Sequence, residues 1–240
     1  MPNIFYSLLT MVIAVISSLI LFLRIKGDSI IFPKVFFWNY ALAFAILSVV
    51  NLPIFFINLG VEIHYNALVF LYLISFLGVL VSYLLFYRST LFLITKDNFF
   101  INIFPFIFIT IFTLFSLFAL FASKIEIFLI YTAGVWGFLL PFNAFLGSIF
   151  IYFFLKGIPN DSIKKYSFSS FLLSIGWFIL LFTDISLWLI SASYPNEFWI
   201  LKIASAKGWF LLRSASYLII LIGVLLYSKQ LHQVERDIIS

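Results

Sequence analysis

Cysteine is absent from the 240-residue sequence, and histidine occurs only as His64 and His232. Without a thiol, the chain can form no disulfide and can hold no thiolate nucleophile or thiolate metal ligand. Both histidines fall in a predicted loop or tail, so we expect no haem ligand within a membrane and no cofactor. A metal-dependent membrane hydrolase would need clustered His, Asp or Glu, and the sequence offers no such cluster, so no metal site is expected.

Charge is also scarce: 10% of the residues are charged, whereas about 25% is typical of soluble domains. Hydrophobic residues make up 65% of the chain and aromatic residues 22%. One core cannot hide so many apolar side chains behind a wettable surface, so the lipid bilayer is the expected solvent and partner. The sequence therefore predicts an all-α, polytopic integral membrane protein.

Seven stretches reach the roughly 20 mostly apolar residues that a membrane-crossing helix needs. They are Ile4–Leu23, Val35–Asn58, Tyr65–Tyr87, Phe99–Ala122, Ile127–Leu155, Ser167–Ser193 and Gly208–Ser228. The runs are continuous, where barrel strands would alternate, so they favour helices. We predict a seven-helix transmembrane bundle over residues 1–228 and a short, helical cytoplasmic tail over residues 229–240. The connections are short, one of them running from Arg88 to Asn98, and favour antiparallel neighbours in chain order.

The lysines and arginines are distributed unequally between the two sides of this topology. Ten of the 14 fall on one side: Arg24, Lys26, Lys34, Arg88, Lys96, Lys156, Lys164, Lys165, Lys229 and Arg236. Only Lys124, Lys202 and Lys207 fall on the other side, and the remaining Arg213 lies within the last span. Basic loops favour the cytoplasm, so the N-terminus is predicted outside and the C-terminus inside. The net charge of +5 then reflects contact with anionic headgroups, and no nucleic-acid partner is expected.

The first apolar stretch lacks the basic start and the small-residue cleavage site of a signal peptide. We therefore expect it to be retained as the first helix of the bundle. The expected location is a cell membrane, as a multi-pass protein of the cytoplasmic membrane of a prokaryote.

Two charged residues lie deep inside predicted spans, Asp184 in the sixth and Arg213 in the seventh. An isolated charge at the bilayer centre costs at least about 2.5–3.5 kcal/mol, so such residues usually pair inside a bundle. At 1.5 Å per helical residue, Asp184 lies about 13 Å from the outer end of its helix, and Arg213 about 9 Å from that of the next. We therefore predict an Asp184–Arg213 ion pair in the outer half of the membrane.

Helical spacing surrounds this predicted pair with aromatic side chains. Trp177 and Trp188 share the face of the carboxylate, and Trp209 and Tyr217 share the face of the guanidinium. Rings that carry polar groups are the usual lining of a small-molecule pocket. We expect these residues to converge on an outward-opening, ligand-binding cavity with three further candidates from other spans: Asn51, Tyr72 and Trp136.

Three roles for the pair stay open from the sequence. It can be a structural pair that fixes helix register, a ligand or signal site, or part of a proton or ion path. Asn51 and Pro53 in the second span also loosely match Pro141 and Asn143 in the fifth. Matched interruptions occur in the broken helices of transporters, but ordinary proline kinks explain them as well.

Other small and polar residues of the spans have less specific roles. The inner half holds few polar residues, so a continuous polar path is not evident; they are chiefly Asn39, Tyr83, Asn102, Asn143 and Tyr152. Several helical glycines are expected to permit close approach of helices: Gly134, Gly137, Gly147, Gly176 and Gly223.

No catalytic residues are predicted, and we do not expect an enzyme. A Ser-His-Asp set cannot be assembled within the bilayer, and the scattered glycines form no phosphate-binding loop. A retinal pigment would need a lysine in the middle of the last helix, and Lys207 and Lys229 lie at its two ends.

The last span reads Gly208-Trp-Phe-Leu-Leu-Arg-Ser-Ala-Ser-Tyr-Leu-Ile-Ile-Leu-Ile-Gly-Val-Leu-Leu-Tyr-Ser-Lys229. Together with the seven spans and the outside N-terminus, it resembles the seven-transmembrane sensor modules found at the N-terminus of bacterial histidine kinases and cyclases. The resemblance implies signal transduction through a final helix that continues into the cytoplasm. No kinase or cyclase domain follows that helix up to Ser240, so the resemblance implies a separate signalling partner.

We therefore expect a receptor-like sensor that binds a small-molecule or lipid ligand and signals through a cytoplasmic partner or a homodimer. A small transporter or channel, and a non-catalytic scaffold or assembly protein, are the alternatives. The tail carries a narrow apolar stripe, Leu231, Val234 and Ile238, which suits either a partner contact or the membrane surface.

Overall fold

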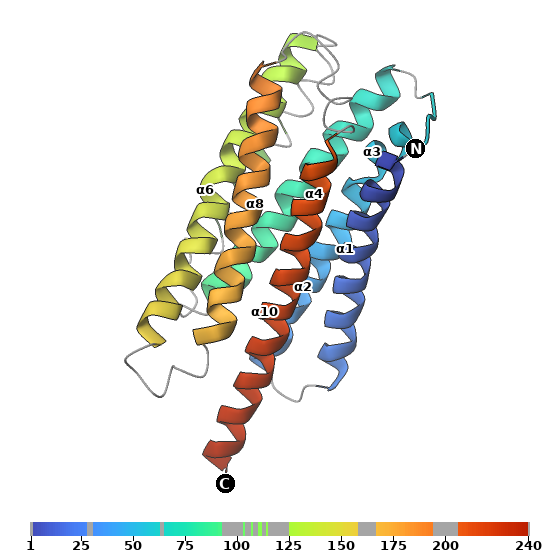
Figure 1. Cartoon of the computed structure of the whole chain (residues 1–240). Coiled ribbons are helices and arrows are strands. Elements are labelled where there is room, and N and C mark those ends of the chain that lie inside the picture. The colour runs from blue at the N-terminus through green and yellow to red at the C-terminus, as the bar shows by residue number, and fades with distance from the viewer. Residues whose placement is uncertain are drawn as a thin grey trace.

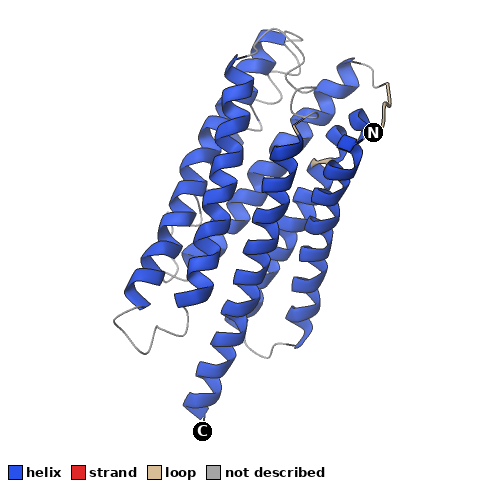
Figure 2. Cartoon of the chain, viewed as in Figure 1, coloured by secondary structure: helices blue, strands red, loops and turns tan. Residues whose placement is uncertain are grey.

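A computed structural model describes residues 2–27, 31–62, 65–92, 125–157, 167–193 and 206–239, with the isolated helical positions 103, 107, 110, 111 and 114. Every element of secondary structure in these residues is a helix (Figure 2), which confirms the predicted all-α class. The predicted span Phe99–Ala122 lies outside the described residues except at those isolated positions.

The helices follow the continuous apolar runs of the sequence. They are α1 (Pro2–Gly27), α2 (Ile31–Val50), α3 (Leu52–Asn58), α4 (Tyr65–Phe92), α6 (Ile125–Gly157), α8 (Ser167–Ser193) and α10 (Lys207–Ile239). A helix satisfies its backbone amides and carbonyls within one segment, which is the requirement that an apolar solvent imposes. The last helix, α10, continues without a break to Ile239, into the residues predicted to form the tail.

The long helices form a bundle in which neighbours in the chain are neighbours in space. α1 packs against α2 and α10, α2 packs against α4, and α8 packs against α6 and α10. A smaller contact between α4 and α6 completes the ring of described helices. The N-terminus and the C-terminus lie at opposite ends of this bundle (Figure 1).

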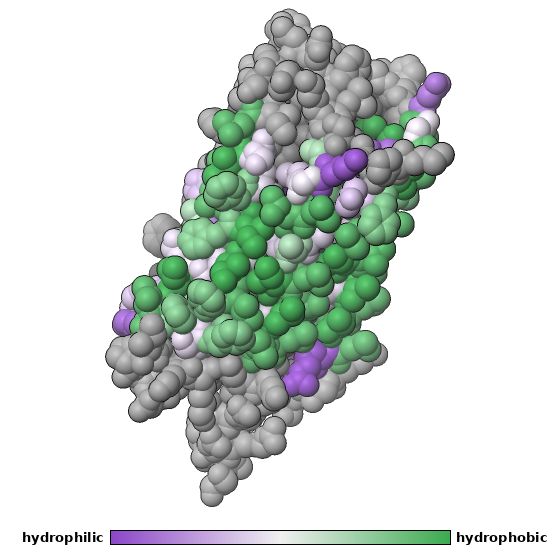
Figure 3. All heavy atoms as spheres, in the orientation of Figure 1, coloured by the Kyte–Doolittle hydropathy of each residue, from purple (hydrophilic) through white to green (hydrophobic). Residues whose placement is uncertain are grey.

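Many large apolar side chains are exposed and many polar side chains are buried, in contrast to a soluble protein. On α1, an entire face of large aliphatic residues is exposed, whereas Ser7, Thr10, Ser17 and Ser18 are buried. Figure 3 shows a band of hydrophobic residues across the visible face, with hydrophilic residues near its edges. Soluble monomers rarely expose continuous apolar surface of this extent.

Four stretches of the described residues are long and apolar enough to cross a membrane: Ile4–Ile25, Lys34–Asn58, Ser167–Ser186 and Lys207–Tyr227. Together with the exposed apolar surface, they identify the chain as a multi-pass membrane protein.

The predicted second span, Val35–Asn58, is not one continuous helix. It divides at Asn51 into α2 and α3, and Pro53 lies in the first turn of α3. Proline has no N–H to donate to the preceding turn, which favours a break at this point. The Asn51 Nδ2 donates to the Leu47 carbonyl oxygen at 2.7 Å and so satisfies backbone at the end of α2. In contrast, α6 continues through Pro141, so the two loosely matched proline sites differ in structure.

The predicted connection from Arg88 to Asn98 begins too early. α4 continues to Phe92, because the polar residues that suggested a loop are accommodated inside the bundle. Ser89 and Thr90 are fully buried, and Ser89 Oγ donates to the Phe36 carbonyl oxygen at 3.3 Å. Thr90 Oγ1 donates to the Phe86 carbonyl oxygen and lies 3.4 Å from the Tyr40 hydroxyl.

Glycine permits close approach at the α8–α10 interface, as expected for Gly176 and Gly223. A Cβ atom on Gly223 would lie 2.7 Å from Leu173 Cγ and 3.2 Å from the Leu173 backbone nitrogen. A Cβ atom on Gly176 would lie 2.6 Å from Ile220 Cγ1. At Gly147, on the α6–α8 interface, the nearest atoms belong to the Phe178 ring at 3.1–3.3 Å.

We predict that Gly223→Ala destabilises the bundle by about 1–3 kcal/mol, the usual cost of overpacking a tight interface. Gly208→Ala is the matched control on the same helix, because a Cβ there meets nothing within 4 Å. Thermal unfolding in detergent should show a lower Tm for the first variant and an unchanged or raised Tm for the second. Equal Tm values in the two variants would contradict the close α8–α10 contact.

Candidate functional site

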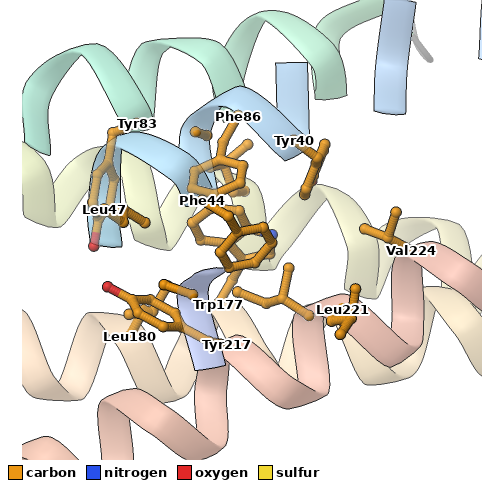
Figure 4. Packing of buried hydrophobic residues seen from close by; sticks show 14 of the residues in the cluster. Tyr40, Phe44, Leu47, Tyr83, Phe86, Trp177, Leu180, Tyr217, Leu221 and Val224 are labelled. Atoms are coloured by element: carbon orange, nitrogen blue, oxygen red, sulfur yellow. The ribbon is translucent and has the colours of Figure 1, made fainter. Parts of the chain in front are cut away.

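Aromatic side chains from four helices fill the centre of the bundle (Figure 4). Phe44 of α2 packs edge-on against Phe86 of α4 and against Tyr217 of α10. Trp177 of α8 packs against Phe86 at 5.0 Å between ring centroids. These rings form an apolar, water-poor setting in which each polar group needs a partner within the protein.

Asp184 of α8 lies beside this aromatic core and is fully buried. Its Oδ2 accepts a hydrogen bond from the Tyr83 hydroxyl of α4 at 2.7 Å and another from Asn143 Nδ2 of α6. Hydrogen bonds to a charged acceptor contribute about 1.5–3 kcal/mol each, more than neutral ones. One carboxylate oxygen therefore connects three helices.

Arg213 of α10 supplies the opposite charge. Its Nη1 lies 3.7 Å from Asp184 Oδ1, which confirms the predicted ion pair, and the side chain is almost fully buried. The Nε of the guanidinium donates to the Tyr217 hydroxyl at 2.7 Å. The guanidinium carbon also lies 4.9 Å from the centre of the Trp209 ring, a cation–π distance.

The ion pair is longer than a direct hydrogen bond, whose donor–acceptor distance is about 2.7–3.2 Å. In the described part of the chain, Asp184 Oδ1 and Asn143 Oδ1 are buried and accept no hydrogen bond. The network therefore keeps two acceptor atoms that its own side chains do not satisfy.

A second polar contact involves the next residue of α10, which faces α1. Ser214 Oγ lies 2.8 Å from Thr10 Oγ1 of α1, and the Thr10 hydroxyl also lies 3.3 Å from the Phe210 carbonyl oxygen. Consecutive residues of α10 thus contact different neighbouring helices, Arg213 contacting α8 and Ser214 contacting α1.

The structure brings together some of the residues predicted to form the site. Trp209 and Tyr217 contact the guanidinium, and Trp177 is buried with its ring centroid 6.2 Å from that of Tyr83, which donates to Asp184. Asn51 is buried, but its amide group donates to its own helix. The side chains of three other candidates lie outside the described residues: Tyr72, Trp136 and Trp188.

Sequence reasoning missed the two residues that donate to the carboxylate. Tyr83 and Asn143 were predicted in the inner half of the membrane and Asp184 in the outer half, whereas the structure brings the three side chains into contact. α4 ends at Phe92, beyond the predicted end of this span at Tyr87, so Tyr83 lies farther from the end of its helix than predicted. Asn143 could have been predicted as a partner from its position near the middle of an apolar span, where a side-chain amide needs a hydrogen-bond partner.

These residues form a charge-balanced polar network that connects α4, α6, α8 and α10. Among the described residues, no group of three or more His, Cys, Asp and Glu side chains could hold a metal ion. The arrangement can fix the relative positions of the four helices. A change in the hydrogen bonds or ion pair of Asp184 would alter the contacts between them.

We predict that Arg213→Ala lowers the free energy of unfolding by about 3–5 kcal/mol, because it leaves a buried carboxylate without its counter-charge. The double variant Asp184→Asn with Arg213→Gln should lose less, because both charges are removed together. Unfolding of the two variants in detergent, followed by circular dichroism, measures the difference. An equal loss in both, or no loss in Arg213→Ala, would mean that the pair does not stabilise the bundle.

Comparisons with protein-family models, with curated proteins and with solved structures find no match to this chain. Its role is therefore inferred from its own residues and their geometry.

Proposed function

We propose that the chain is a seven-helix, receptor-like membrane protein, a sensor that transmits a signal through α10. It would bind a small or lipidic ligand in the outer half of its bundle and act on a cytoplasmic partner or a second copy of itself. The observation that carries the proposal is the continuity of α10. One unbroken helix joins the buried charge network to a segment that extends beyond the bundle.

Helix α10 has 33 residues, from Lys207 to Ile239. Its part that is long and apolar enough to cross a membrane is Lys207–Tyr227. The remaining residues, 228–239, would extend the helix by about 18 Å at 1.5 Å per residue. Figure 1 shows the last turns of α10 projecting past the ends of the other helices. Because a continuous helix transmits displacement, a change at Arg213 would reach this projecting segment.

The ends of α4 and α6 support a seventh crossing between them. α6 begins at the end of the bundle where α4 also begins, and the two helices run in the same direction (Figure 1). Phe92 and Ile125 therefore lie at opposite ends of the bundle, which supports the predicted span Phe99–Ala122 between them. An odd number of crossings also agrees with termini at opposite ends.

The described basic residues support the proposed orientation. Arg24 and Lys156 lie in the last turns of α1 and α6, and Lys34 lies in the first turn of α2. Arg88 lies just before the last turn of α4, and these helix ends meet at the end of the bundle where α10 projects. Lys207 begins α10 at the opposite end. Basic residues favour the cytoplasmic face, so the C-terminal end is assigned there.

A non-catalytic scaffold is the second candidate, and the complete burial of the network favours it. Tyr83, Asn143, Asp184, Arg213 and Tyr217 are each at most 1% exposed. Such a network can serve only to fix the helices in one register. A sensor and a scaffold differ in whether the projecting end of α10 moves when the network changes.

Topology can be tested with single cysteines, because the natural chain has none. We predict that a membrane-impermeant maleimide labels Glu62→Cys in intact cells, because the exposed turn after α3 would lie outside. Gln233→Cys, on the projecting part of α10, should be labelled only after the membrane is opened. The reverse pattern would invert the orientation, and labelling of both positions from one side would exclude an odd number of crossings between them.

Signal transmission can be tested with spin labels at Leu23→Cys on α1 and Gln233→Cys on α10. We predict that adding Asp184→Asn shifts their distance by about 2 Å or more, comparable to helix shifts in known switches. Ser82→Ala is the control, because Ser82 is a buried residue whose hydroxyl donates to the Gly78 carbonyl of its own helix. Pulsed EPR of the reconstituted protein gives the distances. An unchanged distance in Asp184→Asn would favour the scaffold.

A further inference from the structure

Two acceptor atoms in the network, Asp184 Oδ1 and Asn143 Oδ1, point to a ligand. Both are buried, and among the described residues neither accepts a hydrogen bond. Leaving such an atom unsatisfied costs about 1–3 kcal/mol each. The atoms lie close together, because Asn143 Nδ2 donates directly to the other oxygen of the same carboxylate. We infer that the network encloses a small, uncharged molecule that donates hydrogen bonds to these two oxygens.

The Asn143 amide cannot satisfy its own oxygen by rotating. Its Nδ2 faces Asp184 Oδ2, and rotating the amide would place its oxygen against the carboxylate oxygen instead. Two acceptors in contact repel each other, so the amide nitrogen stays on Asp184 and the amide oxygen stays an acceptor. The missing partner is therefore a donor on the side of Asn143 Oδ1.

The charges of the network exclude ionic ligands. Arg213 already balances Asp184, so an added anion would meet the carboxylate and an added cation would meet the guanidinium. Burying an unbalanced charge in this apolar setting is costly. An uncharged donor leaves the balance between the two charges unchanged, and Asp184 Oδ1 has an acceptor position for it because Arg213 Nη1, at 3.7 Å, makes no direct hydrogen bond to that oxygen.

Burial limits the size of the molecule and suggests its chemistry. Tyr83 and Tyr217, which contact Asp184 and Arg213, are at most 1% exposed, so a molecule bound to the two oxygens would be enclosed. A hydroxyl group supplies the required donor, and it can belong to a water molecule or to an uncharged organic ligand. Buried waters typically make about three hydrogen bonds to otherwise unsatisfied polar groups. An organic ligand at this position rests on the proposed sensor function, whereas a bound water molecule is independent of that function.

The test compares the full chain with Asn143→Leu, which removes both the donor to Asp184 and the unsatisfied oxygen. Thr10→Val is the matched control, because Thr10 is a buried hydroxyl whose contacts lie on the α1–α10 side, away from Asp184. Each protein is reconstituted in lipid nanodiscs. Infrared spectra are recorded in ordinary water and in water containing oxygen-18, and each sample is then extracted with solvent for mass spectrometry.

A buried water should give an O–H stretching band that shifts with oxygen-18 in the unsubstituted protein and in Thr10→Val and that is lost in Asn143→Leu. An organic ligand should instead be extracted from those same two proteins and be absent from Asn143→Leu. If the unsubstituted protein yields neither signal, the inference is overturned, whatever the stability of the variants. The spin-label distances report on the sensor function separately, so the two proposals can fail independently.

Discussion

A buried carboxylate and a buried guanidinium hold the centre of this bundle together, and removing either one leaves the other without its counter-charge. The pair forms where water is excluded, so separating Asp184 from Arg213 leaves an uncompensated charge in an apolar setting. Tyr83 and Asn143 add hydrogen bonds from two further helices to the same carboxylate. The positions of α4, α6, α8 and α10 are thus coupled through one side chain.

The tight apolar contacts around the network depend on the same coupling. Gly176 and Gly223 allow α8 and α10 to approach until a methyl group no longer fits between them. Ser216 Oγ donates to the Gly176 carbonyl oxygen across this interface at 2.8 Å, where the missing side chain leaves the backbone accessible. Small residues and the ion pair therefore act together, since close helices bring the two charges within reach.

Much of this architecture follows from the pattern of the sequence. Long apolar runs predicted the helices, with α8 matching its predicted bounds, and the two deep charges predicted their own pairing. The error in the end of α4 arose because its polar residues were interpreted as part of a loop. Ser89 and Thr90 resemble a helix exit in the sequence, yet both are buried by contacts with α2 or within α4. Partners from distant segments, such as Tyr83 and Asn143 for Asp184, depend on tilt and register, which periodicity does not encode.

The contacts of Arg213 with α8 and of Ser214 with α1 have a geometric consequence for α10. They oppose rotation and sliding of the helix at this level. The contacts of Ser216 with Gly176 and of Gly223 with Leu173 hold the next turns of α10 against α8. The helix extends about 24 Å from Gly223 to Ile239, at 1.5 Å per residue. It is therefore a rod held along its first half, and a bend of about 10° at Gly223 would move its far end by about 4 Å.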